Sequence, residues 1–520
     1  MKKFMYAALA VAAVLLFASC KNDKNQPKGQ EKADAYVSFT FNLPQGGTRA
    51  AAGNVAGANA EDTYAGTDAE QEIKEVRVVL YDKNSGDVKY AFDYAITATG
   101  GAAATGADVS GTATAGQFKT KAKGVVSQEY AMLAFINPTA AVKTATAEGK
   151  YLTDAMAAFE GTPDNFKGNG IMMSNAKGVV FIDKNQLKDA EATAEASPIA
   201  VSVDRILAKV FVGSTATGGQ PELPTGVKFT SVKWQLNTTN KKTYAFRMFG
   251  KVMKELNNFV EENPESTEAY YTRFNSYAKD PNFADYEFDA NDFTYLEGTQ
   301  NLMNDFGYED AKGEYCLENT MDQMQQKHNR TTSFVLSGVW TPADKTGMTF
   351  TEGKSWYSYM GFTFTTEKMK EYITEAKDSS KDNKPEIDNT PTGFKTALKE
   401  LLKTTTGTAK EYTVDETSGE PSAAGTVQNI KAYKDGVCYY QTNLIRHFND
   451  SQSNKDMGYG RYGVVRNNIY KINIKKISQP GEPKITNEKE DDGDDDPVKV
   501  YVSFDITVNP WIVRTQDISL

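Results

Sequence analysis

The 520-residue chain has few of the side chains from which enzymes usually build an active site. It holds two histidines, His328 and His447, which lie far apart in the sequence. No cysteine–histidine spacing predicts a zinc site, no glycine-rich loop after a strand predicts phosphate binding, and no turn presents a nucleophilic serine. We therefore expect no enzyme activity, no metal site and no cofactor, and we expect His447 to be a structural residue.

Basic residues are outnumbered, with 58 lysines and arginines against 68 aspartates and glutamates. The net charge of −10 argues against nucleic acid as a partner, because phosphate backbones attract basic surfaces. The acidic run 490–496 has the composition of a calcium loop but lacks its closing glutamate. Together with the nearby prolines, this run predicts a charged, solvated linker at residues 479–497.

Long apolar runs are scarce as well. The run from Met5 to Phe17 follows two lysines and is short for a membrane span. Two small residues and Cys20 come next, which is the pattern of a lipoprotein signal peptide at residues 1–19, with Cys20 as the lipidated first residue. Phe17 stands where leucine is commonest at such sites, and secretion without a lipid is the alternative. No other run predicts a membrane helix, so we expect any membrane attachment to be through lipid.

Cysteine is rare, with three residues in the whole chain. With Cys20 lipidated, Cys316 and Cys438 remain. They could pair in an oxidising exterior, but two lone cysteines fit buried thiols equally well. The sequence leaves a disulfide between them open.

Aromatic residues make up 11% of the chain, and 40 glycines with 17 prolines supply turns, a composition that favours strands. Apolar runs predict strands at residues 73–82, 130–136, 199–203, 206–212, 227–236, 332–340, 360–366, 437–441 and 469–477. We expect helical inserts at 139–160, 248–262, 367–377 and 393–403. Because strands and helices do not alternate regularly, the pattern favours a mainly β fold of sandwiches over a parallel sheet. The glycines and proline at 218–221 predict a boundary between domains at 50–222 and 223–478.

One strand pattern occurs twice. The first copy, residues 36–43, reads Tyr-Val-Ser-Phe-Thr-Phe-Asn-Leu, and the second, residues 501–508, reads Tyr-Val-Ser-Phe-Asp-Ile-Thr-Val. Side chains of a strand alternate between its two faces, so each copy offers one apolar stripe to a core. The two stripes consist of Val37, Phe39, Phe41 and Leu43, and of Val502, Phe504, Ile506 and Val508.

Two strands so alike fit the same place in a sheet. A Gly-Gly-Thr-Arg-Ala stretch follows the first copy closely and offers a protease the bond between Arg49 and Ala50. If cutting there removes the first copy, the second can replace it in a neighbouring molecule, which predicts a polymer. Replacement within the same molecule and two permanent, merely similar edge strands are the alternatives.

Several motifs together resemble the fimbrillins of Bacteroidales type V fimbriae, most of all the Mfa-type shaft subunit of the minor fimbrium. They are the lipoprotein signal, the Leu-Pro…Arg pattern ending at Arg49, the Tyr-Gly-Val-Val-Arg-Asn-Asn-Ile-Tyr run at 462–470, the Cys-Leu-Glu-Asn-Thr run at 316–320, and the Val-Asn-Pro-Trp ending at 508–511. The likeness covers most of the chain from Cys20 onward, and the middle inserts match poorly.

The resemblance implies two transthyretin-like β-sandwich domains and a lipidated precursor in the outer membrane. It implies that residues 20–49 form a propeptide, that an arginine-specific protease cuts after Arg49, and that subunits polymerise by donor-strand exchange through residues 498–520. Other copies of the chain, together with anchor and tip subunits, would then be its partners in a cell-surface fimbrium that supports adhesion, biofilm formation and virulence. A lipid-anchored surface binding protein or a tip adhesin of the same fold is the alternative function, and a lipid-anchored hydrolase is a weaker one.

Overall fold

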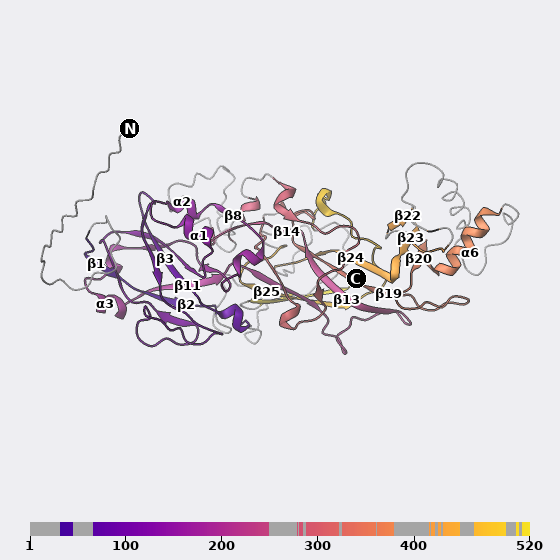
Figure 1. Cartoon of the computed structure of the whole chain (residues 1–520), viewed down its shortest axis with the longest axis horizontal. Helices are drawn as coiled ribbons and strands as arrows, with labels where there is room; N and C mark the ends of the chain where they lie inside the picture. Colours follow the sequence, from indigo (N-terminus) through magenta and orange to yellow (C-terminus); the bar gives the residue numbers. More distant parts are fainter. Residues whose placement is uncertain are drawn as a thin grey trace, which may run out of the picture.

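The structure is a computed structural model. It describes residues 32–44, 66–248, 278, 280–283, 288–321, 325–359, 361–378, 415, 418–421, 425–427, 430–447, 462–495, 506–508 and 512–519, with the backbone alone for the last two ranges. The described part is mainly β, which confirms the predicted fold class. Its two β units lie one after the other along the long axis (Figure 1). None of the described helices is long and apolar enough to cross a membrane.

The first unit is built around an eight-stranded sheet with the order β4-β3-β7-β9-β11-β2-β5, in which β10 also pairs with β7. Its strands are β2 (Phe39–Asn42), β3 (Val76–Asp82), β4 (Val88–Tyr94), β5 (Gln117–Lys119), β7 (Tyr130–Ile136), β9 (Met173–Asn175), β10 (Val180–Ile182) and β11 (Ile199–Arg205). All neighbours run antiparallel except β2 and β11, which are parallel.

Smaller elements complete this unit. They are β1 (Ala35–Val37), β6 (Lys123–Val125), β8 (Ala158–Glu160), α1 (Ala140–Ala145), α2 (Leu152–Ala155) and α3 (Glu191–Ala196). The helical excursion predicted at 139–160 therefore contains two short helices and one short strand.

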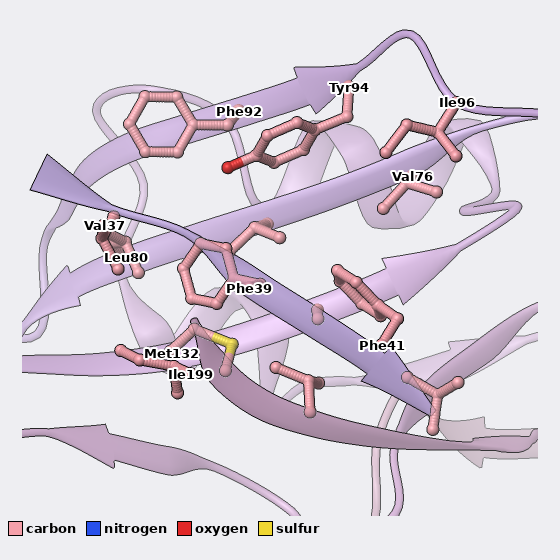
Figure 2. Close-up of a cluster of buried hydrophobic side chains, with 14 of the residues drawn as sticks. Val37, Phe39, Phe41, Val76, Leu80, Phe92, Tyr94, Ile96, Met132 and Ile199 are labelled. Atoms are coloured by element: carbon pink, nitrogen blue, oxygen red, sulfur yellow. The ribbon is translucent and has the colours of Figure 1, made fainter. Parts of the chain in front are cut away.

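Alternate residues of the central strands β3 and β7 enter two different cores. Val78 and Leu80 pack in the first core, whereas Val79 and Tyr81 on the same strand pack in the second. The first core also takes in apolar side chains of β1, β2 and β5, so the sheet closes over it. Figure 2 shows Phe39 and Phe41 of β2 gathered in that core with residues of the other strands.

The second unit is a sandwich of two sheets around one core. The first sheet has the order β18-β12-β25-β27-β26 and the second has the order β17-β13-β19-β24. Side chains such as Val210 and Ile472 from one sheet meet Trp234 and Leu336 from the other in this core. Its strands are β12 (Ala208–Gly213), β13 (Lys228–Asn237), β17 (Asn304–Asp305), β18 (Glu314–Cys316), β19 (Ser333–Thr341), β24 (Val437–Leu444), β25 (Asn468–Lys476), β26 (Ile506–Val508) and β27 (Ile512–Ser519).

The strand pair predicted at 199–212 is divided between the two units. Strand β11 lies in the first sheet, and β12 lies beside β25 and β18 in the second unit. The chain therefore changes sheet at Ile206 and Leu207, earlier than the predicted boundary between residues 222 and 223. The reason is that β12 is buried along its whole length, and its residues Ala208, Val210 and Val212 pack in the core of the second unit.

An insert with its own small core separates β19 from β24 in the sequence. It consists of β20 (Trp356–Tyr359), β21 (Phe362–Thr365), α6 (Thr366–Lys377), β22 (Gly425–Val427) and β23 (Ile430–Tyr433). It lies at the end of the molecule away from the first unit (Figure 1). The helix predicted at 367–377 is confirmed, whereas nearly all of 248–262 and the whole of 393–403 lie outside the described residues. Three two- or three-residue strands complete the fold: β14 (Thr239–Asn240), β15 (Lys242–Tyr244) and β16 (Phe293–Thr294).

The acidic segment after β25 is packed against the second unit, so the prediction of a solvated linker is wrong for residues 479–495. Ile485 is buried in a small apolar cluster, and Glu488 and Asp495 are also buried. The Glu488 carboxylate accepts a hydrogen bond from the Asn237 side-chain amide at 2.9 Å. The Asp495 carboxylate accepts one from the Thr331 hydroxyl. Specific polar partners, which the composition of the segment does not reveal, hold it in place.

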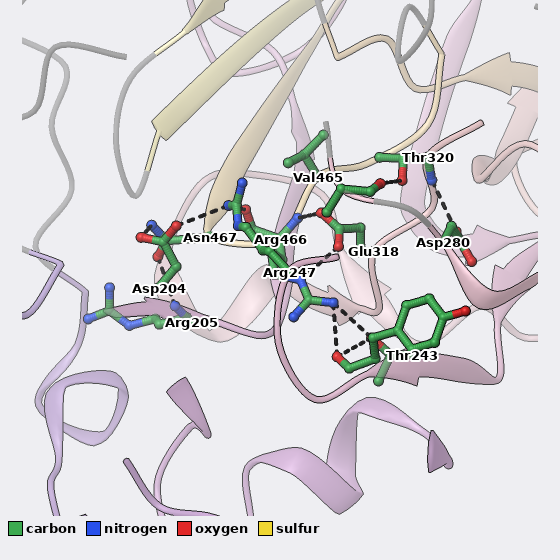
Figure 3. Close-up of polar contacts among 12 residues, drawn as sticks. Asp204, Arg205, Thr243, Arg247, Asp280, Glu318, Thr320, Val465, Arg466 and Asn467 are labelled. Carbon is green, nitrogen blue, oxygen red and sulfur yellow. Dashed lines mark hydrogen bonds and ion pairs between the residues drawn. The ribbon is translucent and has the colours of Figure 1, made fainter. Parts of the chain in front are cut away.

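Polar contacts join the two units at their junction (Figure 3). Arg247 pairs with Asp204 at the end of β11 at 3.1 Å, and the Asn467 amide donates to the same carboxylate at 3.0 Å. Arg466 forms a buried ion pair with Glu318 at 2.7 Å. The run at 462–470 that carried the family resemblance therefore lies at the junction.

A second buried ion pair ties the start of the first unit to the junction. The Glu70 carboxylate lies 2.7 Å from the Lys209 ammonium, with both side chains 2% exposed. The Tyr315 hydroxyl donates to the same carboxylate, and Arg205 donates to the Glu70 carbonyl. Burial alone would raise the pKa of the Glu70 carboxyl, but the Lys209 charge and these hydrogen bonds hold that pKa below its ordinary value.

Candidate functional site

The strand predicted to be removable is an interior member of the first sheet. Strand β2 runs parallel to β11, with Phe39 opposite Ile199, and antiparallel to β5, with Phe41 opposite Phe118. The Phe41 and Phe118 rings stack with their centroids 5.0 Å apart. Because both edges of β2 are paired, its removal would open a gap between β11 and β5, which we call the slot.

The apolar stripe of the first copy faces the core. Val37 is 1% exposed and Phe39 and Phe41 are 0% exposed, whereas Leu43 is partly buried at the core margin. Thr40 and Asn42, which alternate with the phenylalanines on β2, are less deeply buried. The alternation predicted from the sequence is therefore present, and Figure 2 shows this stripe packed against Leu80, Met132 and Ile199.

The strand is interrupted at one point that the sequence pattern did not reveal. Strand β1 pairs with β6, β2 pairs with β5 and β11, and Ser38 lies between the two strands. The Ser38 hydroxyl donates to the Thr120 carbonyl at 2.7 Å, and the Thr120 hydroxyl accepts from the Phe39 amide at 3.0 Å. Both polar side chains are buried, at 1% and 0% exposure.

The residues expected to direct processing lie outside the described part. These are Cys20, which we expect to carry lipid, and the Arg49–Ala50 bond, which we expect to be cut. The described chain stops at Pro44, directly after the removable strand, and resumes at Gly66.

The described parts of the C-terminal tail, residues 506–508 and 512–519, pair with the second unit of their own chain. Ile506 and Val508 lie in β26, which pairs with β27, and β27 pairs in parallel with β25. Val502 and Phe504 lie outside the described residues. The sequence predicted a donor strand at 501–508 but did not predict β27. The polar residues 514–517 interrupt the apolar pattern of β27.

The histidine and cysteine side chains His447, Cys316 and Cys438 are buried in the second unit. His447 is buried with one ring nitrogen 2.7 Å from the Tyr470 hydroxyl. Cys316 and Cys438 are both free thiols, and burial raises the pKa of each, that of Cys438 to about 12. Among the described residues, no group of three or more histidine, cysteine or carboxylate side chains is placed to hold a metal ion.

Comparison with known protein families finds one match, and it lies in the second unit. Residues 431–517 match the family model described as "Major fimbrial subunit protein type IV, Fimbrillin, C-terminal". Over these residues the chain is similar to fimbrillins. The match runs from β23 into β27 and confirms the resemblance to fimbrillins that the sequence motifs predicted. That family is described as one of major fimbrial subunits.

The chain is also similar to solved structures at low sequence identity. A fimbrilin from Porphyromonas gingivalis W83 is 13% identical, with 94% of this chain and 98% of that chain covered and a TM-score of 0.36. A fimbrial assembly protein from Parabacteroides distasonis ATCC 8503 is 13% identical, with 58% and 81% covered and a TM-score of 0.27. The C-terminally truncated tip fimbrial protein Mfa3 from Porphyromonas gingivalis is 12% identical, with 58% and 78% covered and a TM-score of 0.25. No curated protein sequence matches the chain.

Proposed function

We propose that this chain is the shaft subunit of a fimbrium, exported as a precursor lipidated at Cys20. A protease cuts it after Arg49 and removes the strand 36–43. The tail of another subunit then enters the slot and extends the polymer. Anchor and tip subunits end the fibre, which serves adhesion and biofilm formation.

The position of β2 is the observation that carries this proposal. An edge strand can leave a sheet without opening it, but an interior strand leaves unpaired backbone groups on both neighbours. Three fully buried side chains, at about 1.5–3 kcal/mol each, give an upper figure of roughly 5–9 kcal/mol for refilling the slot. An incoming strand supplies both the backbone hydrogen bonds and the apolar stripe, which is the mode of donor-strand complementation.

The tail supports a shaft subunit over a tip adhesin or a surface binding protein. Its strand 501–508 repeats the pattern of 36–43, and a subunit that only ended a fibre or bound a ligand would not need it. In the single chain the tail lies beside β25, so it must leave that position before it can serve a neighbour. The packed segment ending at Asp495 keeps the tail anchored to its own subunit while it does so.

Substitution of Arg49 tests the cleavage step. We expect Arg49→Ala to leave the precursor uncut and to abolish the ladder of polymers on SDS gels, because residues 36–43 keep the slot filled. Arg49→Lys is the matched control: a trypsin-like protease still cuts it, whereas an arginine-specific protease does not. Unchanged ladders from Arg49→Ala would show that cleavage at this bond does not start assembly.

A further inference from the structure

The break between β1 and β2 places a polar group in an otherwise apolar slot. At Ser38 the chain passes from its pairing with β6 to its pairing with β5 and β11. The facing chain is interrupted at the same level, because Thr120 lies between β5 and β6. Ser38 and Thr120 therefore meet where both chains leave one pairing and enter the next.

Three hydrogen bonds hold this point together. The Ser38 hydroxyl donates to the Thr120 carbonyl, the Phe39 amide donates to the Thr120 hydroxyl, and the Thr120 amide donates to the Phe39 carbonyl at 2.8 Å. Both side chains are almost fully buried, so water cannot replace a missing partner. A strand without a donor at this position would leave the Thr120 carbonyl with an unmet acceptor site.

The tail carries the same four residues around the equivalent serine. Residues 36–39 and 501–504 both read Tyr-Val-Ser-Phe, which places Ser503 at the position of Ser38. We propose that Ser503 sets the register in which the tail enters the next subunit, by donating a hydrogen bond to the Thr120 carbonyl there. This inference rests on the proposed donor-strand function and adds the residue that selects one alignment.

The alternative registers are excluded by what they would bury. A slip of one residue turns the apolar stripe away from the core. A slip of two residues keeps the stripe inward but brings Tyr501 or Asp505 to the place of Ser38. A tyrosine ring is far larger than the serine that fills this site, and a carboxylate would be buried against a carbonyl oxygen. Apolar alternation alone would allow these two-residue slips. The requirement for a serine at the place of Ser38 excludes the slipped registers.

The same alignment brings one new charge pair into the polymer. Thr40 of β2 lies opposite Lys119 of β5, and Asp505 is the tail residue that corresponds to Thr40. Cross-strand pairs of opposite charge stabilise a sheet slightly, and Lys119 is exposed, so the gain is small and salt-sensitive. In this register the tail gains a contact that the removed strand lacked.

The test compares full-length, Arg49-cut subunits that carry Ser503→Ala or, as the outward-facing control, Thr507→Ala. Polymers are diluted into denaturant and their dissociation rate is measured. We expect the Ser503→Ala polymer to dissociate roughly ten-fold faster than the wild type and the Thr507→Ala polymer to remain close to it. Thr120→Val removes the hydroxyl but keeps the backbone carbonyl that accepts from the serine, so Ser503→Ala should still speed dissociation in polymers that carry Thr120→Val.

Two further measurements separate the register proposal from the proposed function. Ser38→Ala should weaken retention of the first strand in the uncut precursor and leave the cut polymer unchanged. If Ser503→Ala polymers dissociate at the wild-type rate, the register proposal is wrong while donor-strand assembly stands. If cut subunits that lack residues 498–520 assemble as well as cut wild-type subunits, the proposed function fails and the register proposal fails with it.

Discussion

At the scale of single residues, the strand 36–43 is held by three buried apolar side chains and by one buried polar contact, between Ser38 and Thr120. Val37, Phe39 and Phe41 follow a two-residue period, which any half-buried strand shows. The burial of Ser38 depends on Thr120, more than eighty residues away in the sequence. A contact between two polar residues so far apart leaves no local pattern to read.

The first prediction separates the precursor from the mature subunit. Phe41→Ala should lower the free energy of unfolding of the uncut precursor by about 3–5 kcal/mol, because Phe41 is fully buried and stacks on Phe118. After cleavage the substitution should have no effect, since the strand has left. Thermal and denaturant unfolding of both forms measure this, with Thr40→Ala as the control. An equal loss in the cut form would show that the strand stays bound.

The second prediction concerns pH. Burial raises the pKa of Glu314 to about 7, although its carboxylate accepts hydrogen bonds from the Leu236 amide and from Asn304. The folded state therefore holds a proton that the unfolded state releases near pH 4.5, so stability falls as the pH rises between these values. Glu314→Gln keeps the acceptor and cannot ionise. Its Tm, relative to the wild type, should rise between pH 5 and pH 8, and a constant difference would contradict this.

At the scale of elements, strands such as β3 and β7 and the helix α6 followed from local patterns, but the partners of the C-terminal elements did not. Residues 479–495 have the composition of a solvated linker, yet they pack along the second unit through Ile485 and Glu488. Strand β27 has a weak apolar period and forms through backbone pairing with β25. Composition predicts solvation only where no complementary surface is available, and that surface is not visible in the segment itself.

The third prediction concerns the C-terminal tail as the donor strand. Deletion of residues 498–520 should leave a folded subunit that accepts a donor strand but offers none. Mixed with cut wild-type subunits, it should shorten the polymers in proportion to its share, as a chain terminator does. Electron microscopy and gel ladders of mixtures give the length distribution. Polymers of undiminished length, with the deleted subunit built in along them, would contradict the donor role of the tail.

At the scale of the whole molecule, the Glu70–Lys209 and Asp204–Arg247 ion pairs join the two units into one elongated body (Figure 1). A fibre that bears tension needs such a junction between every pair of units. The crossing at Ile206 and the ion pairs at Glu70 and Arg466 were not predictable from the sequence. Their partners come from distant parts of the sequence.

The fourth prediction tests the junction. Glu70→Ala leaves the buried Lys209 ammonium without its main partner and should lower the free energy of unfolding by about 3–5 kcal/mol. The double variant Glu70→Ala with Lys209→Met should recover much of this loss, because no buried charge remains unpaired. Glu222→Ala, which breaks an exposed pair with Lys476, should cost at most about 1 kcal/mol. A loss at Glu70 no larger than at Glu222 would contradict the role of the buried pair.

The most direct test of the account is a cross-link between two differently labelled, cut subunits. One carries Gln117→Cys, an exposed position opposite Asn42 of the removed strand, and the other carries Thr507→Cys, the tail residue that corresponds to Asn42. A subunit with both Lys471→Cys and Thr515→Cys reports the tail on its own β25. The account predicts a disulfide between residues 117 and 507 of different molecules in the polymer, with the internal one lost on assembly. Polymers that form without the intermolecular disulfide and keep the internal one would contradict it.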